Sequence, residues 1–170
     1  MEKNRRSIRV KEFDYSQEGL YAVTICTQNK HHIFGEIDNG EMILNKYGKI
    51  AKKHWTSIPN RYPNVKLDKY IIMPNHVHLI VEIKPLVGAI HELPLPQKRR
   101  NMLLPKLIGY YKMNSSKQIN QIKKTPGYRL WQRNYYEHII RNEKDLSYIR
   151  YYIDNNPSNW EKDHYLNECA

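Results

Sequence analysis

Two histidines two positions apart, His76 and His78, form the pattern with the clearest chemical meaning in the sequence. They begin an apolar, strand-like segment that directly follows the turn-forming pair Pro74-Asn75. Residues two apart in a strand point to the same face, so both imidazoles can reach one divalent ion. With 8 histidines in 170 residues, chance alone produces about 0.4 such pairs. The pair by itself therefore leaves two readings open, a metal site and a hydrogen-bonded structural pair.

Tyr152 and Asn156 form a second pair with chemical potential. They lie four positions apart in a segment of helical periodicity that begins after Asn142, so they share one face of the expected helix. A tyrosine hydroxyl acts as a nucleophile when its proton is removed or its charge is stabilised, and an amide oxygen is a ligand for hard cations. The alternative is structural: Tyr152 packs on a sheet, and Asn156 caps a helix that Pro157 ends.

The segment from Trp131 to His138, with Arg141 just after it, mixes aromatic rings, cations and amides. This combination is typical of surfaces that stack unpaired bases, although a strand with its own buried aromatics has the same composition. The chain has 14 tyrosines, and its 28 Lys and Arg exceed its 17 Asp and Glu, which gives a net charge of +11. Such an excess favours nucleic acid as the partner over an ordinary basic surface.

Several enzyme classes lack their signatures in this sequence. It contains no phosphate-cradling glycine-rich loop, no Gly-x-Ser-x-Gly elbow, no His-Glu-x-x-His helix and no cysteine zinc motif. These absences argue against P-loop ATPases, serine hydrolases and zincins. The first residues lack an apolar signal core, and no stretch approaches about 20 apolar residues, so we expect a cytoplasmic, nucleoid-associated protein with no membrane contact.

Periodicity and turn signals define the elements that must position these groups. Asn39-Gly40 predicts a tight hairpin turn, Asn45 and Asn142 are predicted helix N-caps, and Pro59 is expected to end the first helix. The predicted strands are 21–27, 33–37, 41–44, 65–73, 76–83 and 136–140. The predicted helices are 45–55, 103–123 and 142–156, and the predicted loop is 84–101.

This order predicts an α+β fold in which helices cover one face of an antiparallel sheet. The β-α-β-β-α-β core matches the ferredoxin-like, RRM-like split motif, with the histidine pair on a central strand. We expect a basic N-terminal arm at 1–19, followed by a single catalytic domain at 20–170.

Taken together, the motifs resemble those of the REP-associated tyrosine transposases, a branch of the single-tyrosine HUH transposases in the insertion-sequence-200-like superfamily. The segment Met73-Pro74-Asn75-His76-Val77-His78-Leu79 resembles the HUH motif of that family. The stretch from Trp131 to Asn156 resembles its C-terminal signature, which here ends in Tyr152-Ile153-Asp154-Asn155-Asn156-Pro157. The similarity extends over roughly residues 20–162, and two separate motifs in the right order make it specific.

The resemblance implies a definite chemistry. His76, His78 and Asn156 would bind Mg²⁺ or Mn²⁺, and Tyr152 would attack the scissile phosphate of single-stranded DNA. The product would be a 5′-phosphotyrosine linkage and a free 3′-OH, and a later 3′-OH attack would rejoin strands without ATP. Tyr148 shares the face of Tyr152 and is the reserve nucleophile, whereas Tyr151 is rotated about 100° away.

The resemblance also implies a hairpin with a single-stranded flank as the DNA substrate, and a monomer rather than a homodimer. Six residues are candidate DNA contacts: Tyr110, Lys112, Lys117, Arg133, His138 and Arg141. The rival hypothesis is a module of the same fold that binds hairpin or single-stranded nucleic acid without cutting it. The complete set of metal ligands and nucleophile favours the enzyme.

Overall fold

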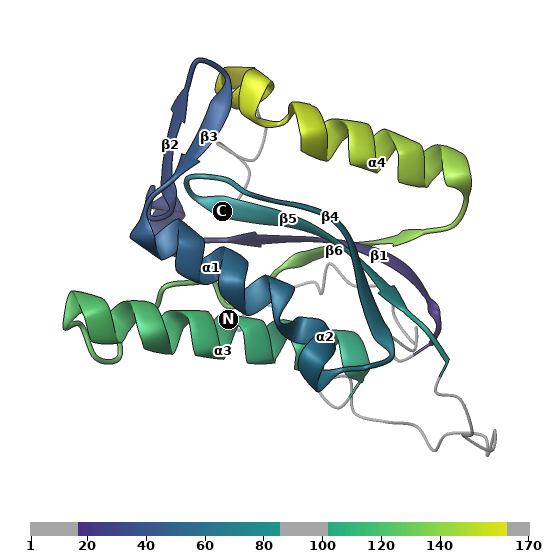
Figure 1. Cartoon of the computed structure of the whole chain (residues 1–170), viewed down its shortest axis with the longest axis horizontal. Helices are drawn as coiled ribbons and strands as arrows, with labels where there is room; N and C mark the ends of the chain where they lie inside the picture. Colours follow the sequence, from purple (N-terminus) through teal and green to yellow (C-terminus); the bar gives the residue numbers. More distant parts are fainter. Residues whose placement is uncertain (1–16, 86–101, 163–170) are drawn as a thin grey trace, which may run out of the picture.

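The computed structural model describes residues 17–85 and 102–162, which form a four-stranded sheet, a separate hairpin and covering helices (Figure 1). The strands of the main sheet are β1 (Gly19–Cys26), β4 (Val65–Ile72), β5 (His76–Ile83) and β6 (Tyr136–Ile140). Most of the expected arm and of the 84–101 loop lies outside the described residues, so the boundary near residue 19 stays a prediction.

The sheet has the strand order β4-β5-β1-β6, and its adjacent strands are all antiparallel. This is the order of a split β-α-β-β-α-β motif, so the predicted α+β, ferredoxin-like class is confirmed. The histidine pair lies on β5, a central strand as expected. The β1–β5 register pairs Cys26 with His76 and Thr24 with His78.

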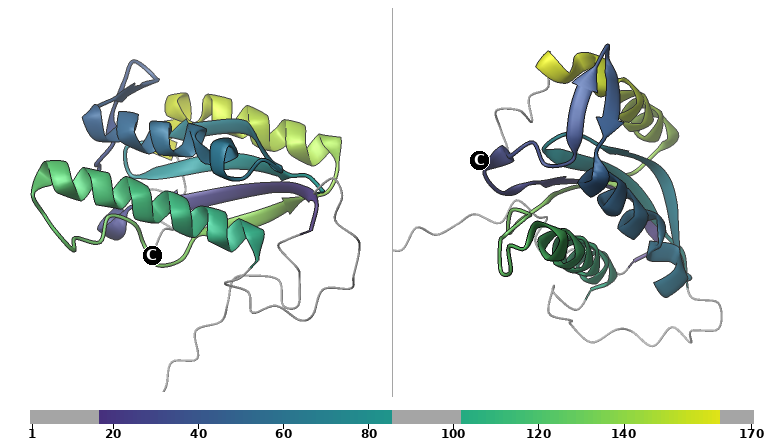
Figure 2. Two further views of the ribbon diagram at one scale, coloured as in Figure 1. Left: turned by 60° about the horizontal axis from the view of Figure 1, so that its bottom comes forward. Right: turned by 60° about the vertical axis from the view of Figure 1, so that its left-hand side comes forward.

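Two helices cover one face of the sheet, α1 (Lys46–Thr56) and α3 (Leu103–Lys123) (Figure 2). Asn45 caps α1 as predicted, because its side chain accepts hydrogen bonds from the amides of Tyr47 and Gly48 at 2.8 and 3.0 Å. Pro59 does not simply end this helix. It lies in the first turn of a short helix, α2 (Ile58–Arg61), where its missing amide proton costs nothing.

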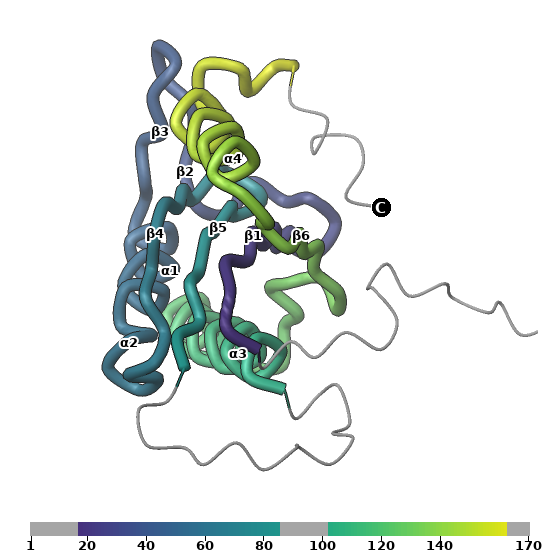
Figure 3. Tube along the Cα trace, turned by 90° about the vertical axis from the view of Figure 1, so that its right-hand side faces the viewer, coloured from purple at the N-terminus to yellow at the C-terminus, as the bar shows by residue number. Residues whose placement is uncertain are grey.

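The last long helix, α4 (Glu143–Asn155), lies on the opposite face of the sheet (Figures 1 and 3). The expected arrangement on one face therefore holds for α1 and α3 but not for α4. The reason is that β5 is buried along both faces, with Leu79 packed on the α1–α3 side and Ile80 on the α4 side. Asn142 caps α4 as predicted, accepting from the amide of Asp145 at 2.9 Å.

The remaining elements flank the sheet at the end where β5 begins (Figure 1). They are the hairpin β2 (Gly35–Asp38) and β3 (Glu41–Leu44), and two 3-10 helices, η1 (Gln28–Lys30) and η3 (Pro157–Lys162). The predicted hairpin turn is confirmed, since Asn39 and Gly40 both have positive φ, at 50° and 78°. None of the described helices is long and apolar enough to cross a membrane.

Candidate functional site

The side chains of His76 and His78 lie on the α4 face of the sheet. Strand alternation sends Val77 and Leu79 into the larger core beneath α1 and α3, and the histidines to the other side. Both histidines are buried, with exposed fractions of 0% and 4%. Two buried imidazoles require partners for their ring nitrogens.

An oxygen atom lies beside the Nδ1 atom of each imidazole. Asn75 Oδ1 is 2.7 Å from His76 Nδ1, and Thr24 Oγ1 is 2.8 Å from His78 Nδ1. Because an amide oxygen can only accept, His76 Nδ1 carries the proton and its Nε2 keeps a lone pair. Thr24 lies directly opposite His78 in the β1–β5 register, and its hydroxyl can accept from or donate to His78 Nδ1 according to the tautomer.

The Nε2 atoms of His76 and His78 converge to 2.9 Å, with the rings edge to face at a centroid distance of 4.5 Å. In an octahedral site, adjacent ligand atoms lie at right angles around the metal ion, each roughly 2.1 Å from it. Two such ligand atoms are therefore about 3.0 Å apart. The spacing is that of neighbouring ligands of one cation, and it is equally that of an N–H···N hydrogen bond between the two imidazoles. Oxygen partners on Nδ1 are also the usual support of metal-bound histidines.

The environment of His78 favours its neutral form. Burial lowers the pKa of His78 well below its ordinary value, and the nearby charge of His76, when protonated, lowers it further. A neutral imidazole with an available Nε2 lone pair is the form that binds metals.

Tyr152 reaches this pair from α4. Its hydroxyl lies 3.5 Å from His78 Nε2, and the two rings meet edge to face at 5.1 Å. The neighbouring candidates differ from it: Tyr148 and Tyr151 are 68% and 69% exposed. Of these three tyrosines, Tyr152 is the one for which the structure gives a contact with the histidine pair.

Asn156 lies one helical turn after Tyr152, at the C-cap of α4, and is 1% exposed. The buried C-cap position before Pro157 matches the structural alternative that the sequence analysis gave for Asn156. This position is also compatible with a role as a metal ligand. Among the described residues, no group of three or more His, Cys, Asp or Glu side chains could hold a metal. Within the described residues, a third protein ligand beside the two histidines would therefore be an oxygen of another type, such as an amide.

Two residues near the histidines were missed by the sequence analysis. The Trp160 ring in η3 stacks on His76 at a centroid distance of 5.9 Å and an interplanar angle of 22°, and His32 meets its edge at 5.5 Å. Thr24 is the other. No spacing pattern marks either residue, because strand register brings Thr24 to the site and a chain reversal after Pro157 brings Trp160.

A groove of about 670 Å³ opens beside Tyr152, between α4 and the β1–β6 half of the sheet. Tyr136, His138 and Tyr148 line it together with Tyr152 and apolar side chains from β1 and α4. His138 Nε2 lies 2.8 Å from Asp145 Oδ2 across the groove. The groove gives the Tyr152 hydroxyl an open approach from solvent.

Comparison with known proteins relates the chain, by sequence and by fold, to other proteins. No family model matches the chain. An uncharacterised protein of Haemophilus influenzae is 42% identical over 167 residues, which cover 94% of this chain and 92% of the relative. A second Haemophilus influenzae protein, described as "Putative REP-associated tyrosine transposase", is 27% identical over 152 residues, covering 85% of this chain and 73% of that one.

A solved structure of a REP-associated tyrosine transposase bound to a REP hairpin has the same fold, with a TM-score of 0.56. It is 16% identical in sequence, and the match covers 89% of this chain and 74% of that one. The chain is a distant relative of the REP-associated tyrosine transposases. The family resemblance that the two sequence motifs indicated is thereby confirmed.

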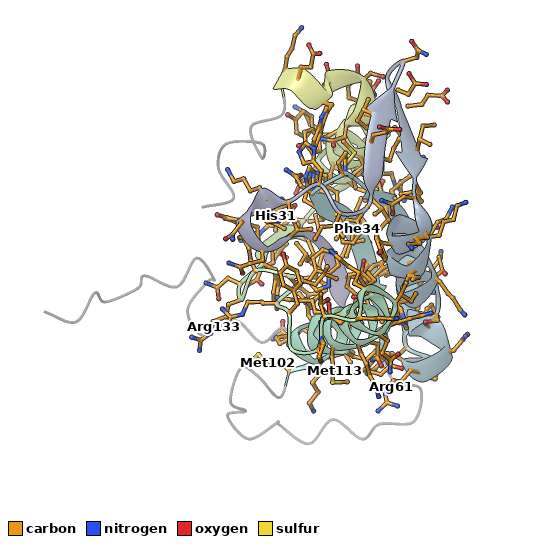
Figure 4. The ribbon with its side chains drawn as sticks, turned by 90° about the vertical axis from the view of Figure 1, so that its left-hand side faces the viewer. His31, Phe34, Arg61, Met102, Met113 and Arg133 are labelled. Carbon is orange, nitrogen blue, oxygen red and sulfur yellow. The ribbon has the colours of Figure 1, made fainter. Side chains whose placement is uncertain are left out.

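The six residues predicted to contact DNA in this chain lie on different sides of the sheet. Tyr110, Lys112 and Lys117 lie on α3, on the face away from Tyr152. Figure 4 shows Arg133 on this side of the molecule, away from α4. The guanidinium carbon of Arg61 lies 4.8 Å from the centroid of the Tyr110 ring. The Lys112 ammonium donates a hydrogen bond to the carbonyl oxygen of Arg133, with an N···O distance of 3.0 Å.

The other two candidates lie on the α4 side. His138 lines the groove beside Tyr152, and Arg141 is exposed where β6 leads into α4. Lys117 and Arg133 are exposed, whereas Lys112 is held against backbone carbonyls. The role of all six in DNA binding stays a prediction.

Proposed function

We propose that the chain is a divalent-metal-dependent endonuclease and strand transferase that acts on single-stranded DNA beside a hairpin. The observation that carries the proposal is the position of the Tyr152 hydroxyl, 3.5 Å from one of two converging imidazoles. A nucleophile next to a metal-competent pair, at the wall of an open groove, is the arrangement that phosphodiester cleavage requires.

His76 and His78 would hold Mg²⁺ or Mn²⁺, with Asn156 as the proposed third ligand. The bound ion supplies Lewis-acid polarisation of the scissile phosphate. The chain's own contribution is to fix the two Nε2 atoms through Asn75 and Thr24 and to keep the His78 ring neutral by burial.

Tyr152 is the proposed nucleophile. Its phenolic oxygen forms a bond to phosphorus, and the bond from phosphorus to the 3′ oxygen breaks. The phenol loses its proton, and the leaving 3′ oxygen gains one and becomes the free 3′-OH. The 5′ end stays linked to the tyrosine. Attack by another 3′-OH reverses the step and joins strands, so the energy of the phosphodiester is conserved and no ATP is needed.

The proposed substrate is a DNA hairpin with an unpaired flank. A relative with the same fold was solved with a REP hairpin, and the net charge of +11 suits a polyanion. Helices α1 and α3 contain lysines but no Asp or Glu, so both helices carry a net positive charge. The groove beside Tyr152 has aromatic walls on which unpaired bases can stack.

Within one copy of the chain, Tyr152 contacts His78, and His78 contacts His76. The contact between Tyr152 and His78 forms within one chain, so we propose a monomer whose tyrosine acts on DNA held at its own metal site.

Covalent capture tests the proposed function. The protein is incubated with Mn²⁺ and labelled hairpin oligonucleotides that carry variable single-stranded flanks, and the products are separated on a denaturing gel. We expect a DNA-linked protein band that requires the metal and disappears in Tyr152→Phe and His76→Ala. The matched controls Tyr148→Phe and Tyr151→Phe remove a hydroxyl from exposed tyrosines of the same helix and should keep the band.

The outcomes separate the two hypotheses. A band that survives in Tyr152→Phe but is lost in Tyr148→Phe means that the nucleophile is misassigned. Metal-independent hairpin binding without any covalent band, across the full pool of flanks, favours the binding module instead.

A further inference from the structure

Two ion pairs join α4 to the edge strand β4. Arg150 donates to both carboxylate oxygens of Asp68, with Nε 2.8 Å from Oδ1 and Nη2 2.5 Å from Oδ2. One helical turn later, Lys69 Nζ lies 2.8 and 2.9 Å from the two oxygens of Asp154. The adjacent β4 residues Asp68 and Lys69 thus form ion pairs with two α4 residues that are four positions apart. These four residues are called the α4 clamp below.

A bulge in β4 makes the α4 clamp possible. Leu67 pairs with Val81 and Tyr70 pairs with Leu79, so Asp68 and Lys69 together face the single residue Ile80 of β5. In a regular strand, neighbouring side chains point to opposite faces, and only one of the two could reach α4. The extra residue of the bulge lets both side chains contact the same helix, and bulges often redirect side chains in this way.

Apolar packing by itself restrains α4 weakly. Among the described residues, the core between α4 and the sheet has four buried members, Ile80, Ile140, Leu146 and Ile153, with five partly buried residues packed against them, whereas the core on the other face has 23 buried members. On the Tyr152 side the helix borders the open groove of about 670 Å³, and the Tyr152 ring is held there by its edge-to-face contact with His78. Apolar contacts are not directional. Packing of α4 against the sheet through such contacts therefore defines the rotation of the helix about its axis poorly.

The position of the Tyr152 hydroxyl depends on that rotation. Tyr152 is two residues from both Arg150 and Asp154, hence about 200° around the helix from each. The clamped side and the tyrosine side are therefore opposite sides of α4. With the hydroxyl roughly 6 Å from the helix axis, a rotation of about 20° would move it by about 2 Å. A displacement of about 1 Å from reacting geometry can already cost about a hundredfold in rate.

We propose that Asp68, Lys69, Arg150 and Asp154 are positioning residues that fix the rotation of α4 and thereby aim Tyr152 at the histidine pair. The inference rests on the proposed role of Tyr152 as the nucleophile. The clamp contacts neither the histidines nor the groove in the described structure, so its effect is on the helix and not on the chemistry.

Charge exchange across the stronger pair tests the α4 clamp. The variants are Arg150→Asp, the exchanged double variant Asp68→Arg/Arg150→Asp, and Arg150→Lys, which keeps the charge but loses the two-pronged geometry. Three quantities are measured: the covalent linkage rate at saturating hairpin, the hairpin Kd without metal, and hydrogen exchange of the α4 amides. Lys144→Asp is the matched control, because Lys144 is an exposed cation of α4 at the far end from the clamp.

The α4 clamp predicts a rate loss of about a hundredfold in Arg150→Asp, with the hairpin Kd within about twofold of the wild type. The exchanged double variant should regain at least about tenfold of that loss, Arg150→Lys should be intermediate, and Lys144→Asp should keep the wild-type rate. Protection of the α4 amides should follow the same order. An Arg150→Asp rate equal to the wild type, or a loss matched by an equal rise in Kd, would overturn the proposal.

The failure of the clamp is distinguishable from the failure of the proposed function. If the wild type forms no covalent adduct, the nuclease proposal fails, and hydrogen exchange then decides the clamp alone. Protection lost in Arg150→Asp and regained in the exchanged variant supports it, and unchanged protection overturns it. If Arg150→Asp does not fold, Arg150→Lys and the exchanged variant supply the same comparison.

Discussion

The hydroxyl of Tyr152 lies 3.5 Å from His78 Nε2, although the two residues are 74 positions apart in the chain. The contact exists because β5 presents His78 on the face of the sheet that α4 covers. Since His78 Nδ1 lies beside Thr24 and its Nε2 faces His76, the same imidazole links Tyr152, the proposed nucleophile, to the proposed metal site.

Thr24→Val should weaken the metal site without unfolding the protein. The change removes the oxygen 2.8 Å from His78 Nδ1 and keeps the side-chain volume, so the imidazole loses its orienting partner. We expect the Kd for Mn²⁺, measured by titration calorimetry, to rise by about tenfold to a hundredfold. Thr56→Val is the control, because that exposed hydroxyl donates only to carbonyls of its own helix in the structure, at 3.1 Å. Equal Kd values in both variants would argue against an orienting role for Thr24.

The buried His78 should make the metal-free protein less stable in mild acid. Its pKa in the folded state lies well below the ordinary value of 6.5, so the unfolded chain binds the proton more readily. Stability from this group is therefore complete above about pH 6.5 and is lost as the pH falls below it, by up to about 1.4 kcal/mol per pH unit. Denaturant unfolding in EDTA should show this slope in the wild type and less of it in His78→Gln. Parallel curves for the two proteins would contradict the prediction.

The Asp68–Arg150 pair should contribute to stability over a different pH range. Hydrogen bonds from Arg150 lower the pKa of Asp68 below its ordinary value of 3.8. The contribution is therefore present above that value and is lost as the pH falls through the lower folded-state pKa. The pair is partly exposed, so we expect up to about 1 kcal/mol between wild type and Asp68→Asn at pH 7. The difference should disappear near pH 2, and a constant difference would exclude the carboxylate as its source.

Trp160 should support His76 through its ring rather than through hydrogen bonding. The two rings stack at 5.9 Å with 22° between their planes. Trp160→Phe keeps an aromatic face and should retain Mn²⁺ affinity, whereas Trp160→Ala should lose several-fold, corresponding to about 1 kcal/mol. Titration of both variants with Mn²⁺, with the melting temperature as a check on folding, makes the comparison. A similar loss in both variants would point to the indole N–H instead.

The sequence determined the local elements and the residue types of the site. The Asn39-Gly40 turn, the Asn45 and Asn142 caps and the alternation along β5 all depend on interactions within a few residues, so their patterns are visible in the chain itself. The same alternation is sufficient to place His76 and His78 on one face. The two motifs also indicated the family, which the comparisons confirmed.

Only the tertiary structure decided how these pieces meet. Periodicity shows that α4 has an apolar side but not which face of the sheet receives it, so the expected single helical layer was wrong for α4. The partnership of Thr24 with His78 depends on strand register, and the joint reach of Asp68 and Lys69 depends on a one-residue bulge. Such relationships are set by the packing of segments far apart in sequence, whose energies are not encoded in the spacing of any one segment.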